Sequence, residues 1–173
     1  MCSLNLFKID LKALEEGLSD FHFSLDDEYF KAIEASNVQG GNVCVDLSVR
    51  RNDKVFTLNF HTRGVVRIPC DRCLDEMEQP IETNDSVVAK LGEENSEEDE
   101  DVVTVAEDEG ILDVAWLIYE FIALGIPVKH VHAPGKCNPA MIRMLEEYSA
   151  ARSGEEDKDT VDPRWEVLKN LKL

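Results

Sequence analysis

Residues 43–73, which hold the clearest strand pattern in the chain, read VCVDLSVRRNDKVFTLNFHTRGVVRIPCDRC. Apolar residues occupy every second position in residues 43–50 and alternate again in residues 55–60. This alternation is typical of strands that bury one face. Asn52-Asp53, between the two runs, is a turn signal, so we expect the two segments to pair as an antiparallel hairpin.

The sequence around this hairpin predicts further strands. Arg63-Gly64 indicates a second turn, which would precede a third strand at residues 65–68. Residues 85–91 predict a fourth strand, and the alternating residues 21–25 predict one that comes earlier in the chain. We therefore expect a three-stranded antiparallel meander with a C-x2-C pair at the end of its third strand.

Caps and apolar stripes predict helices. The first follows Asp26, an N-cap residue, and would end before Gly40-Gly41. Its apolar face would consist of Tyr29, Phe30 and Ile33. A later one begins at Asn138 or Pro139, with apolar side chains from Met141, Leu145 and Tyr148. Together with the strands, these helices predict an α+β protein, an antiparallel sheet with a few packed helices.

Residues 113–124 carry the clearest helical pattern. Asp113 would be its N-cap, Gly125 and Pro127 would end it, and its apolar stripe would consist of Val114, Leu117, Ile118, Phe121 and Ile122. Glu120 lies near that stripe. Its carboxylate is expected to reach water, because a charged residue at a helix flank rarely stays buried.

The chain is strongly acidic. Its 173 residues include 36 acidic and 18 basic ones, for a net charge of −18, and 43% are hydrophobic. Such a charge repels nucleic acid at long range and attracts basic proteins. The charge is segregated, however, since residues 93–109 hold ten acidic and no basic residues, whereas residues 42–72 hold six basic and three acidic ones. The net charge alone therefore does not exclude RNA as a partner.

Composition predicts the domain organisation. Residues 1–150 are expected to form a single α+β domain that contains an acidic, mobile loop at about residues 92–110, within which residues 102–105 would be a short strand or part of the loop. Residues 151–161 form a polar linker, and residues 162–173 a short amphipathic C-terminal helix. This helical tail would either dock a partner or cap the domain through Trp165, Leu168 and Leu171.

The sequence predicts a cytoplasmic protein. It has no apolar run near the roughly 20 residues that a membrane helix needs, and its N-terminus lacks the basic flank and apolar stretch of a signal peptide. Five cysteines, an odd number, fit reduced thiols. We therefore expect no membrane partner.

Three cysteines and a histidine form a candidate metal site. Cys70-Asp71-Arg72-Cys73 supplies two thiolates, and His132 and Cys137 follow about sixty residues later. Together they would complete a tetrahedral Cys3His site for one structural zinc ion, with His130 as the alternative to His132. Two other interpretations stay open. One is a redox pair, since C-x2-C spacing lowers a thiol pKa; the other is a pair of structural cysteines in a turn, with histidines exposed to solvent.

Basic residues around the predicted sheet suggest an RNA-binding face. Its arginines, which would contact RNA phosphates, are Arg50, Arg51, Arg63, Arg67 and Arg72. The alternative is that they are solvated and paired with the abundant acids of this chain. RNA-binding sheets also expose aromatic side chains that stack on bases. Here Phe56, Leu58 and Phe60 share one strand face and are expected in the core instead.

The order of these features resembles a known family. A Cys-x-Arg-Cys motif at residues 70–73 precedes the acidic stretch, an apolar helix that runs into Leu124-Gly125-Ile126-Pro127-Val128, the His132/Cys137 segment and a terminal segment that begins Asp162-Pro163. From about residue 43 to its end, the chain resembles the YceD family, the large ribosomal RNA subunit accumulation proteins of bacteria and plastids. Some relatives carry a richer cysteine cluster after the proline, where this chain has Cys137 alone.

The resemblance implies a function in ribosome biogenesis. The family is implicated in the accumulation, processing or stability of 23S rRNA, and no enzymatic activity is established for it. We therefore expect a non-catalytic adaptor for large-subunit rRNA or for an assembling ribosomal protein, with no small-molecule substrate. No glycine-rich phosphate loop and no His-Glu-x-x-His motif occurs in the sequence. The alternative is a zinc-dependent hydrolase or nuclease acting on RNA, with Asp71, Asp75 and Glu76 near the metal.

Overall fold

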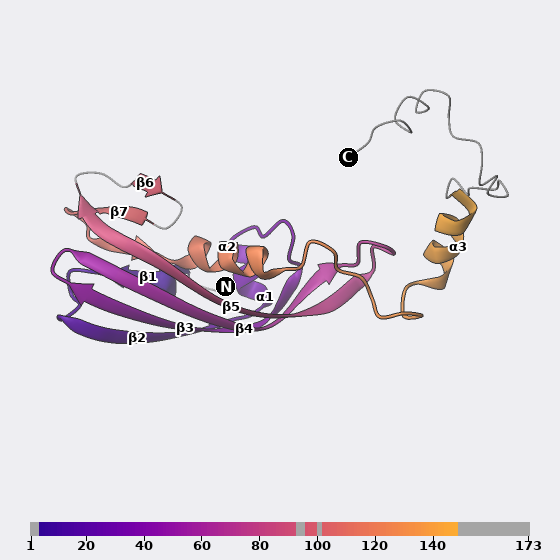
Figure 1. The fold of residues 1–173 in the computed structure, drawn as a ribbon, viewed down its shortest axis with the longest axis horizontal. Coiled ribbons are helices and arrows are strands. Elements are labelled where there is room, and N and C mark those ends of the chain that lie inside the picture. The colour runs from indigo at the N-terminus through magenta and orange to yellow at the C-terminus, as the bar shows by residue number, and fades with distance from the viewer. Residues whose placement is uncertain (1–3, 93–95, 100–101, 149–173) are drawn as a thin grey trace, which may run out of the picture. The chain divides into compact units, whose positions relative to one another are not determined.

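The protein is built on one large mixed sheet (Figure 1), in a computed structural model that describes residues 4–92, 96–99 and 102–148. The strands of this sheet follow the order β2-β3-β4-β5-β7-β6, and β1 and β8 form a separate pair. The predicted α+β class is confirmed. The elements are a 3-10 turn at Leu4–Phe7, β1 (Lys8–Asp10), β2 (Gly17–Leu25), α1 (Asp27–Ala32), β3 (Gly40–Asn52), β4 (Val55–Pro69), β5 (Glu76–Gly92), β6 (Ser96–Asp99), β7 (Val102–Ala106), β8 (Ile111–Asp113), α2 (Ala115–Gly125) and α3 (Pro139–Tyr148).

Two compact units divide the chain, Met1–Cys137 and Asn138–Leu173. All strands, α1 and α2 belong to the first unit, and α3 belongs to the second. The start of α3 at Pro139 agrees with the predicted start. The predicted linker and the C-terminal helix with Trp165, Leu168 and Leu171 lie outside the described residues, so the domain boundary at residue 150 stays a prediction.

Alternation of apolar residues builds the central strands. β3 and β4 pair antiparallel with Leu47 opposite Phe60 and Val49 opposite Leu58, and all four side chains are buried. Because these residues share one face, that face becomes the core, and the prediction that Phe56, Leu58 and Phe60 are core residues is confirmed.

The predicted turn at Arg63-Gly64 is wrong. β4 continues through these residues to Pro69 and pairs with β3, with Gly64 opposite Val43. A Cβ atom at Gly64 would lie 2.3 Å from the carbonyl oxygen of Asn42, so the glycine marks a close approach of two strands. The expected second and third strands are therefore one strand. The third strand of the meander is β5, which contains the predicted strand at residues 85–91.

Helix α1 begins as its sequence predicts. The Asp26 carboxylate accepts hydrogen bonds from the backbone N–H groups of Glu28 (2.9 Å) and Tyr29 (3.1 Å), which identifies Asp26 as the N-cap. Tyr29 and Phe30 are buried, and the Tyr29 hydroxyl donates to the carbonyl oxygen of Ala115 at 2.6 Å. This bond connects α1 to the start of α2.

Helix α2 begins later than predicted. Its N-cap is Val114, which has no side chain that can cap, whereas the predicted cap Asp113 ends β8. The Asp113 carboxylate still accepts a hydrogen bond from the Ala115 N–H at 3.0 Å. Asp113 thus satisfies a backbone donor at the helix start although it is the residue before the N-cap. The pairing of β8 with β1 decides the boundary, because it holds Asp113 in extended backbone.

Both α1 and α2 lie on one face of the large sheet (Figure 1). Ile118 and Ile122 of α2 are fully buried, and the ring of Phe121 contacts that of Phe60 with centroids 5.1 Å apart. Glu120 is exposed, as expected. No helix among the described residues is long and apolar enough to cross a membrane.

Part of the acidic stretch belongs to the sheet. β7 pairs parallel with β5, with Val88 opposite Val102, and β6 pairs antiparallel with β7. Of the two alternatives for residues 102–105, a short strand or part of the loop, the structure shows the strand, and Val105 is buried. The acidic composition of the stretch favoured a loop. Its apolar run Val102–Ala106 instead forms a strand that pairs with β5. The described part of the stretch is thus not a loop throughout; residues 93–95 and 100–101 lie outside the described residues.

Candidate functional site

A tight turn between β4 and β5 presents the C-x2-C pair. The N–H of Cys70 donates to the carbonyl oxygen of Asp75 at 2.8 Å, and the N–H of Leu74 donates to that of Cys70 at 2.9 Å. Leu74 closes the turn with a positive φ of 62°. The sequence placed the pair after a strand, and the structure shows why both thiols come together: the turn buries the side chains of Cys70 and Cys73 completely.

Asp71 joins this turn to the segment that follows α2. Its N–H donates to the carbonyl oxygen of His130 at 3.0 Å, and its carboxylate accepts the His130 N–H at 2.8 Å. The same carboxylate lies 3.2 Å from Nε2 of the His130 ring, whose Nδ1 is 3.0 Å from the carbonyl oxygen of Pro127. His130, the alternative ligand in the sequence analysis, thus contacts Asp71 and Pro127 and is not in the thiol cluster.

The structure brings Cys70, Cys73, His132 and Cys137 together. One donor atom from each residue lies within 4.8 Å of the other three. Sγ of Cys70 is 4.0 Å from Sγ of Cys137, and Sγ of Cys73 is 3.4 Å from Nδ1 of His132. In a tetrahedral zinc site these edges would be about 3.8 Å for two sulfurs and about 3.6 Å for sulfur and nitrogen, from zinc–ligand bonds of about 2.3 and 2.1 Å. The spacing of the cluster therefore fits a single metal ion.

Electrostatics in the cluster also favour a cation. Burial raises the pKa of the Cys70 thiol, but the N–H groups of His132, Arg72 and Cys73 outweigh burial and lower that pKa to about 6. Burial, together with the neighbouring Cys70 and Cys73, raises the pKa of Cys137 to about 11. A second thiolate is thus disfavoured beside the first. A bound zinc ion would remove this conflict, because a thiol that coordinates zinc is deprotonated.

The carboxylates near the cluster have other partners. Asp71 pairs with His130, and Glu76 lies 3.5 Å from Nε of Arg67. The cluster itself supplies four protein donors, which is the arrangement of structural zinc sites; catalytic sites keep three protein ligands and one open position. The arrangement is suited to holding two chain segments together.

Several of the arginines predicted to bind RNA are engaged within the protein. Arg63 lies 3.6 Å from the Asp46 carboxylate, and Arg67 lies 2.8 Å from that of Asp27. Arg51 donates to the backbone carbonyl of Leu14 and lies over the ring of Phe56. Arg50 and Arg72 are exposed. The structure therefore does not gather the five arginines into one free cationic face.

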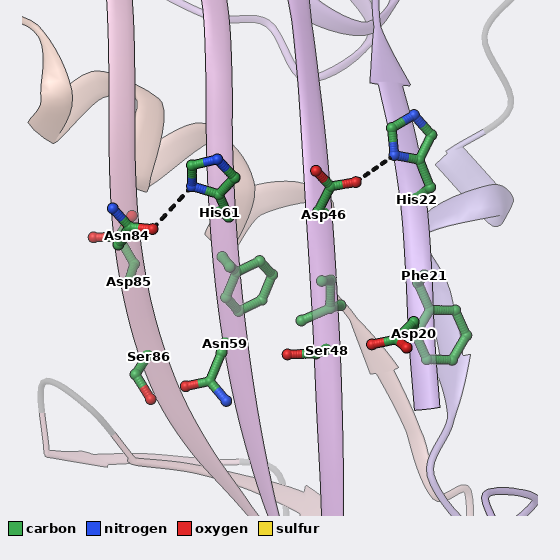
Figure 2. A pocket seen from close by; sticks show the side chains of 12 residues that line it. Asp20, Phe21, His22, Asp46, Ser48, Asn59, His61, Asn84, Asp85 and Ser86 are labelled. Atoms are coloured by element: carbon green, nitrogen blue, oxygen red, sulfur yellow. Dashed lines mark hydrogen bonds and ion pairs between the residues drawn. The ribbon is translucent and has the colours of Figure 1, made fainter. Parts of the chain in front are cut away.

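The solvent face of the sheet is polar instead (Figure 2). His22, Asp46, His61 and Asn84 lie in register across β2, β3, β4 and β5. Nδ1 of His22 is 2.6 Å from the Asp46 carboxylate, and Nδ1 of His61 is 2.9 Å from the side-chain oxygen of Asn84. The hydrogen bond from His22 lowers the pKa of Asp46. This hollow of about 630 Å³ has Asp20, Asp46 and Asp85 and the two histidines among its lining residues.

The histidines of this hollow, His22 and His61, were not among the residues predicted from the sequence. Alternation assigned Asp46 and its neighbours to the solvent side of β3, and that assignment alone indicates a polar face. The pairs with His22 and Asn84 depend on the register between strands, which alternation within one strand does not determine.

Comparison with known proteins identifies the family. A family model described as the large ribosomal RNA subunit accumulation protein YceD matches residues 58–172. The chain belongs to the YceD family. No curated protein and no solved structure gave a match. The matched part begins in β4 and includes all four residues of the thiol cluster, and the resemblance found in the sequence is thereby confirmed.

Proposed function

We propose that this YceD-family protein supports the accumulation of 23S rRNA and the biogenesis of the large ribosomal subunit in the cytoplasm. It would act as a non-catalytic adaptor for rRNA or for an assembling ribosomal protein. The family match over residues 58–172 carries this proposal, because the description of the family names large-subunit rRNA accumulation.

Within this function, the thiol cluster would hold one structural zinc ion. The ligands would be Cys70, Cys73 and Cys137 through sulfur and His132 through Nδ1. The ion would fix the segment after α2 to the β4–β5 turn, next to the Asp71–His130 contacts that already join them. Three thiolates and one imidazole suit zinc better than magnesium or calcium, which prefer oxygen ligands.

A structural site also argues for an adaptor over the alternative, an RNA hydrolase. The four donors leave no open position for a reacting water, and two of the nearby carboxylates are paired with His130 and Arg67. In the proposed function, the protein binds its partners through its surface, and the metal ion stabilises the shape of that surface.

Depletion of the protein in its own cells tests the function. We expect mature 23S rRNA to fall relative to 16S rRNA, and the protein to co-sediment with large-subunit precursors without degrading them. Wild-type protein and a Cys44→Ser variant should restore 23S levels, because Cys44 lies on β3 outside the cluster. Unchanged 23S levels would overturn the proposal. RNA cleavage by purified protein that is lost in Cys73→Ser and depends on added zinc would instead establish the hydrolase.

A further inference from the structure

Helix α2 carries apolar residues on more than the face it buries. Its sequence, AWLIYEFIALG, contains one charged residue, Glu120. Ile118 and Ile122 face the core, yet Trp116 is 51% exposed and Leu124 is 81% exposed. A helix that is apolar all round is normally covered on every side. The exposed side of α2 is therefore an apolar surface that a partner could cover.

This side of α2 borders a groove. The cavity has a volume of about 470 Å³, and its lining includes Trp116, Leu117, Phe121 and Leu124 of α2, Val87 of β5 and Val103 of β7. A large aromatic residue and a leucine beside a hollow are typical of the centre of a protein interface, where buried anchors supply most of the binding energy.

The groove carries negative charge. Glu120 lines it and accepts a hydrogen bond from the indole N–H of Trp116 at 2.7 Å. No lysine or arginine is among the lining residues that the structure describes. The groove thus combines an apolar floor with negative charge, in a chain of net charge −18.

We propose that this groove binds a basic amphipathic segment of a partner protein. Its apolar side chains would fill the hollow between Trp116 and Leu124, and its lysines or arginines would lie toward Glu120. This inference rests on the proposed function, because it names the class of partner that the adaptor holds. Opposite charge speeds the encounter of two proteins and excludes unsuitable partners, while the apolar contact supplies the affinity.

RNA fits this groove poorly. Phosphate groups need cations at the surface they contact, whereas the described lining of the groove holds the carboxylate of Glu120 and no lysine or arginine. The arginines most suited to phosphates lie elsewhere, and Arg63 and Arg67 are paired with Asp46 and Asp27. The chemistry of the groove therefore selects a basic protein segment over nucleic acid.

Trp116 provides a direct reporter of occupancy. The chain has two tryptophans, so a Trp165→Phe variant of the full-length protein leaves Trp116 as the only indole. The probe is a synthetic 14-residue helical peptide of leucine and lysine with one apolar face, and its matched control has glutamate in place of every lysine. We expect the lysine peptide to shift the Trp116 emission to shorter wavelength and to saturate, and the glutamate peptide to have no effect.

A pair of leucine variants separates the groove from general attraction between opposite charges. Leu124→Ser should weaken binding of the lysine peptide by about tenfold, within the range seen when an interface anchor is truncated. Leu18→Ser, in the same background, is the matched control, because Leu18 is also exposed (59%) but lies on β2. Equal affinities of the two variants would overturn the proposal, since binding would then reflect net charge alone.

Other occupants of the groove would give different results. A 23S rRNA fragment that shifts Trp116 emission and competes with the peptide would overturn the proposal in favour of RNA. Emission from Trp116 that is already at short wavelength and shielded from acrylamide in the free protein would mean that the same chain, or a second copy, covers the groove. Failure of the proposed function would show separately, as 23S rRNA levels that do not respond to depletion of the protein.

Discussion

Asp71 connects the two halves of the thiol cluster without belonging to it. Its backbone and carboxylate both bind His130, two residues before the ligand His132. Asp71→Ala should therefore weaken zinc binding by about tenfold, the lower end of the range for residues that orient a metal site. Competition with a chromophoric chelator measures this affinity. Arg72→Ala is the control, because Arg72 is the exposed neighbour in the same turn, and equal affinities for the two variants would contradict this role of Asp71.

A second residue-scale prediction concerns pH. The hydrogen bond from Arg67, followed by that from the Gly41 N–H, lowers the pKa of Asp27 below its ordinary value of 3.8. A carboxylate whose folded pKa is depressed stabilises the fold above its unfolded pKa and loses that contribution as pH falls through the folded value. In urea unfolding, wild-type protein should be more stable than Asp27→Asn at pH 7, and the difference should close below pH 3.8. A difference that stays constant throughout would contradict this assignment.

At the scale of elements, Gly64 determines how closely β3 and β4 approach. A Cβ atom there would lie 2.3 Å from the Asn42 carbonyl oxygen and 2.6 Å from Cα of Val43, and neither backbone atom has room to move. Gly64→Ala should cost about 2 kcal/mol, as expected for an overpacked interior. Gly17→Ala is the matched control, since Gly17 also has a positive φ (122°) but no atom within 4 Å of the added carbon. Equal losses in chemical denaturation would show that contact with β3 is not the cause.

The two sides of α2 should respond differently to truncation. Ile118 is fully buried, so Ile118→Ala should lower the free energy of unfolding by about 2–5 kcal/mol. Leu124 is 81% exposed in the free protein, so Leu124→Ala should change it by less than about 0.5 kcal/mol. Thermal or chemical unfolding measures both. A large loss at Leu124 would mean that this side chain belongs to the core and is not available to a partner.

Local sequence patterns predicted which helices and strands form better than they predicted the residues at which these elements begin and end. The Asp26 cap and the alternation in β3 depend on neighbours in the chain, so the sequence was sufficient. A glycine at position 64 is compatible with a turn and with a close approach of two strands. Only the pairing of β4 with β3 and β5 distinguishes these alternatives. Helix α2 starts later than predicted because β8 pairs with β1, which is a contact between distant segments of the chain. Tertiary pairing therefore accounts for the wrong predictions.

In the candidate site as well, local spacing predicted some features and contacts between distant segments decided the others. Cysteine and histidine spacing was enough to propose four ligands, but it did not distinguish His132 from His130. That distinction comes from Asp71, which binds His130 and leaves the Nδ1 of His132 beside Cys73. The sequence left open whether the arginines pair with acids of this chain, and it did not identify their partners, because Asp46 and Asp27 reach Arg63 and Arg67 from other elements.

At the scale of the whole molecule, the protein combines a sheet with a polar solvent face, an apolar groove beside α2 and a thiol cluster with four donor atoms. Family membership supplies the process, large-subunit rRNA accumulation. We propose that a metal ion at the cluster joins the β4–β5 turn to the segment after α2.

Metal content of protein purified under reducing conditions tests this claim most directly. Elemental analysis with thiol titration should find one zinc ion per chain in the wild type and in Cys44→Ser, whose cysteine lies outside the cluster. Both Cys73→Ser and Cys137→Ser should lose the ion, because one removes a ligand from the turn and the other removes a ligand from the distant segment. Wild-type protein that takes up no zinc and has freely reactive thiols at Cys70, Cys73 and Cys137 would contradict the claim.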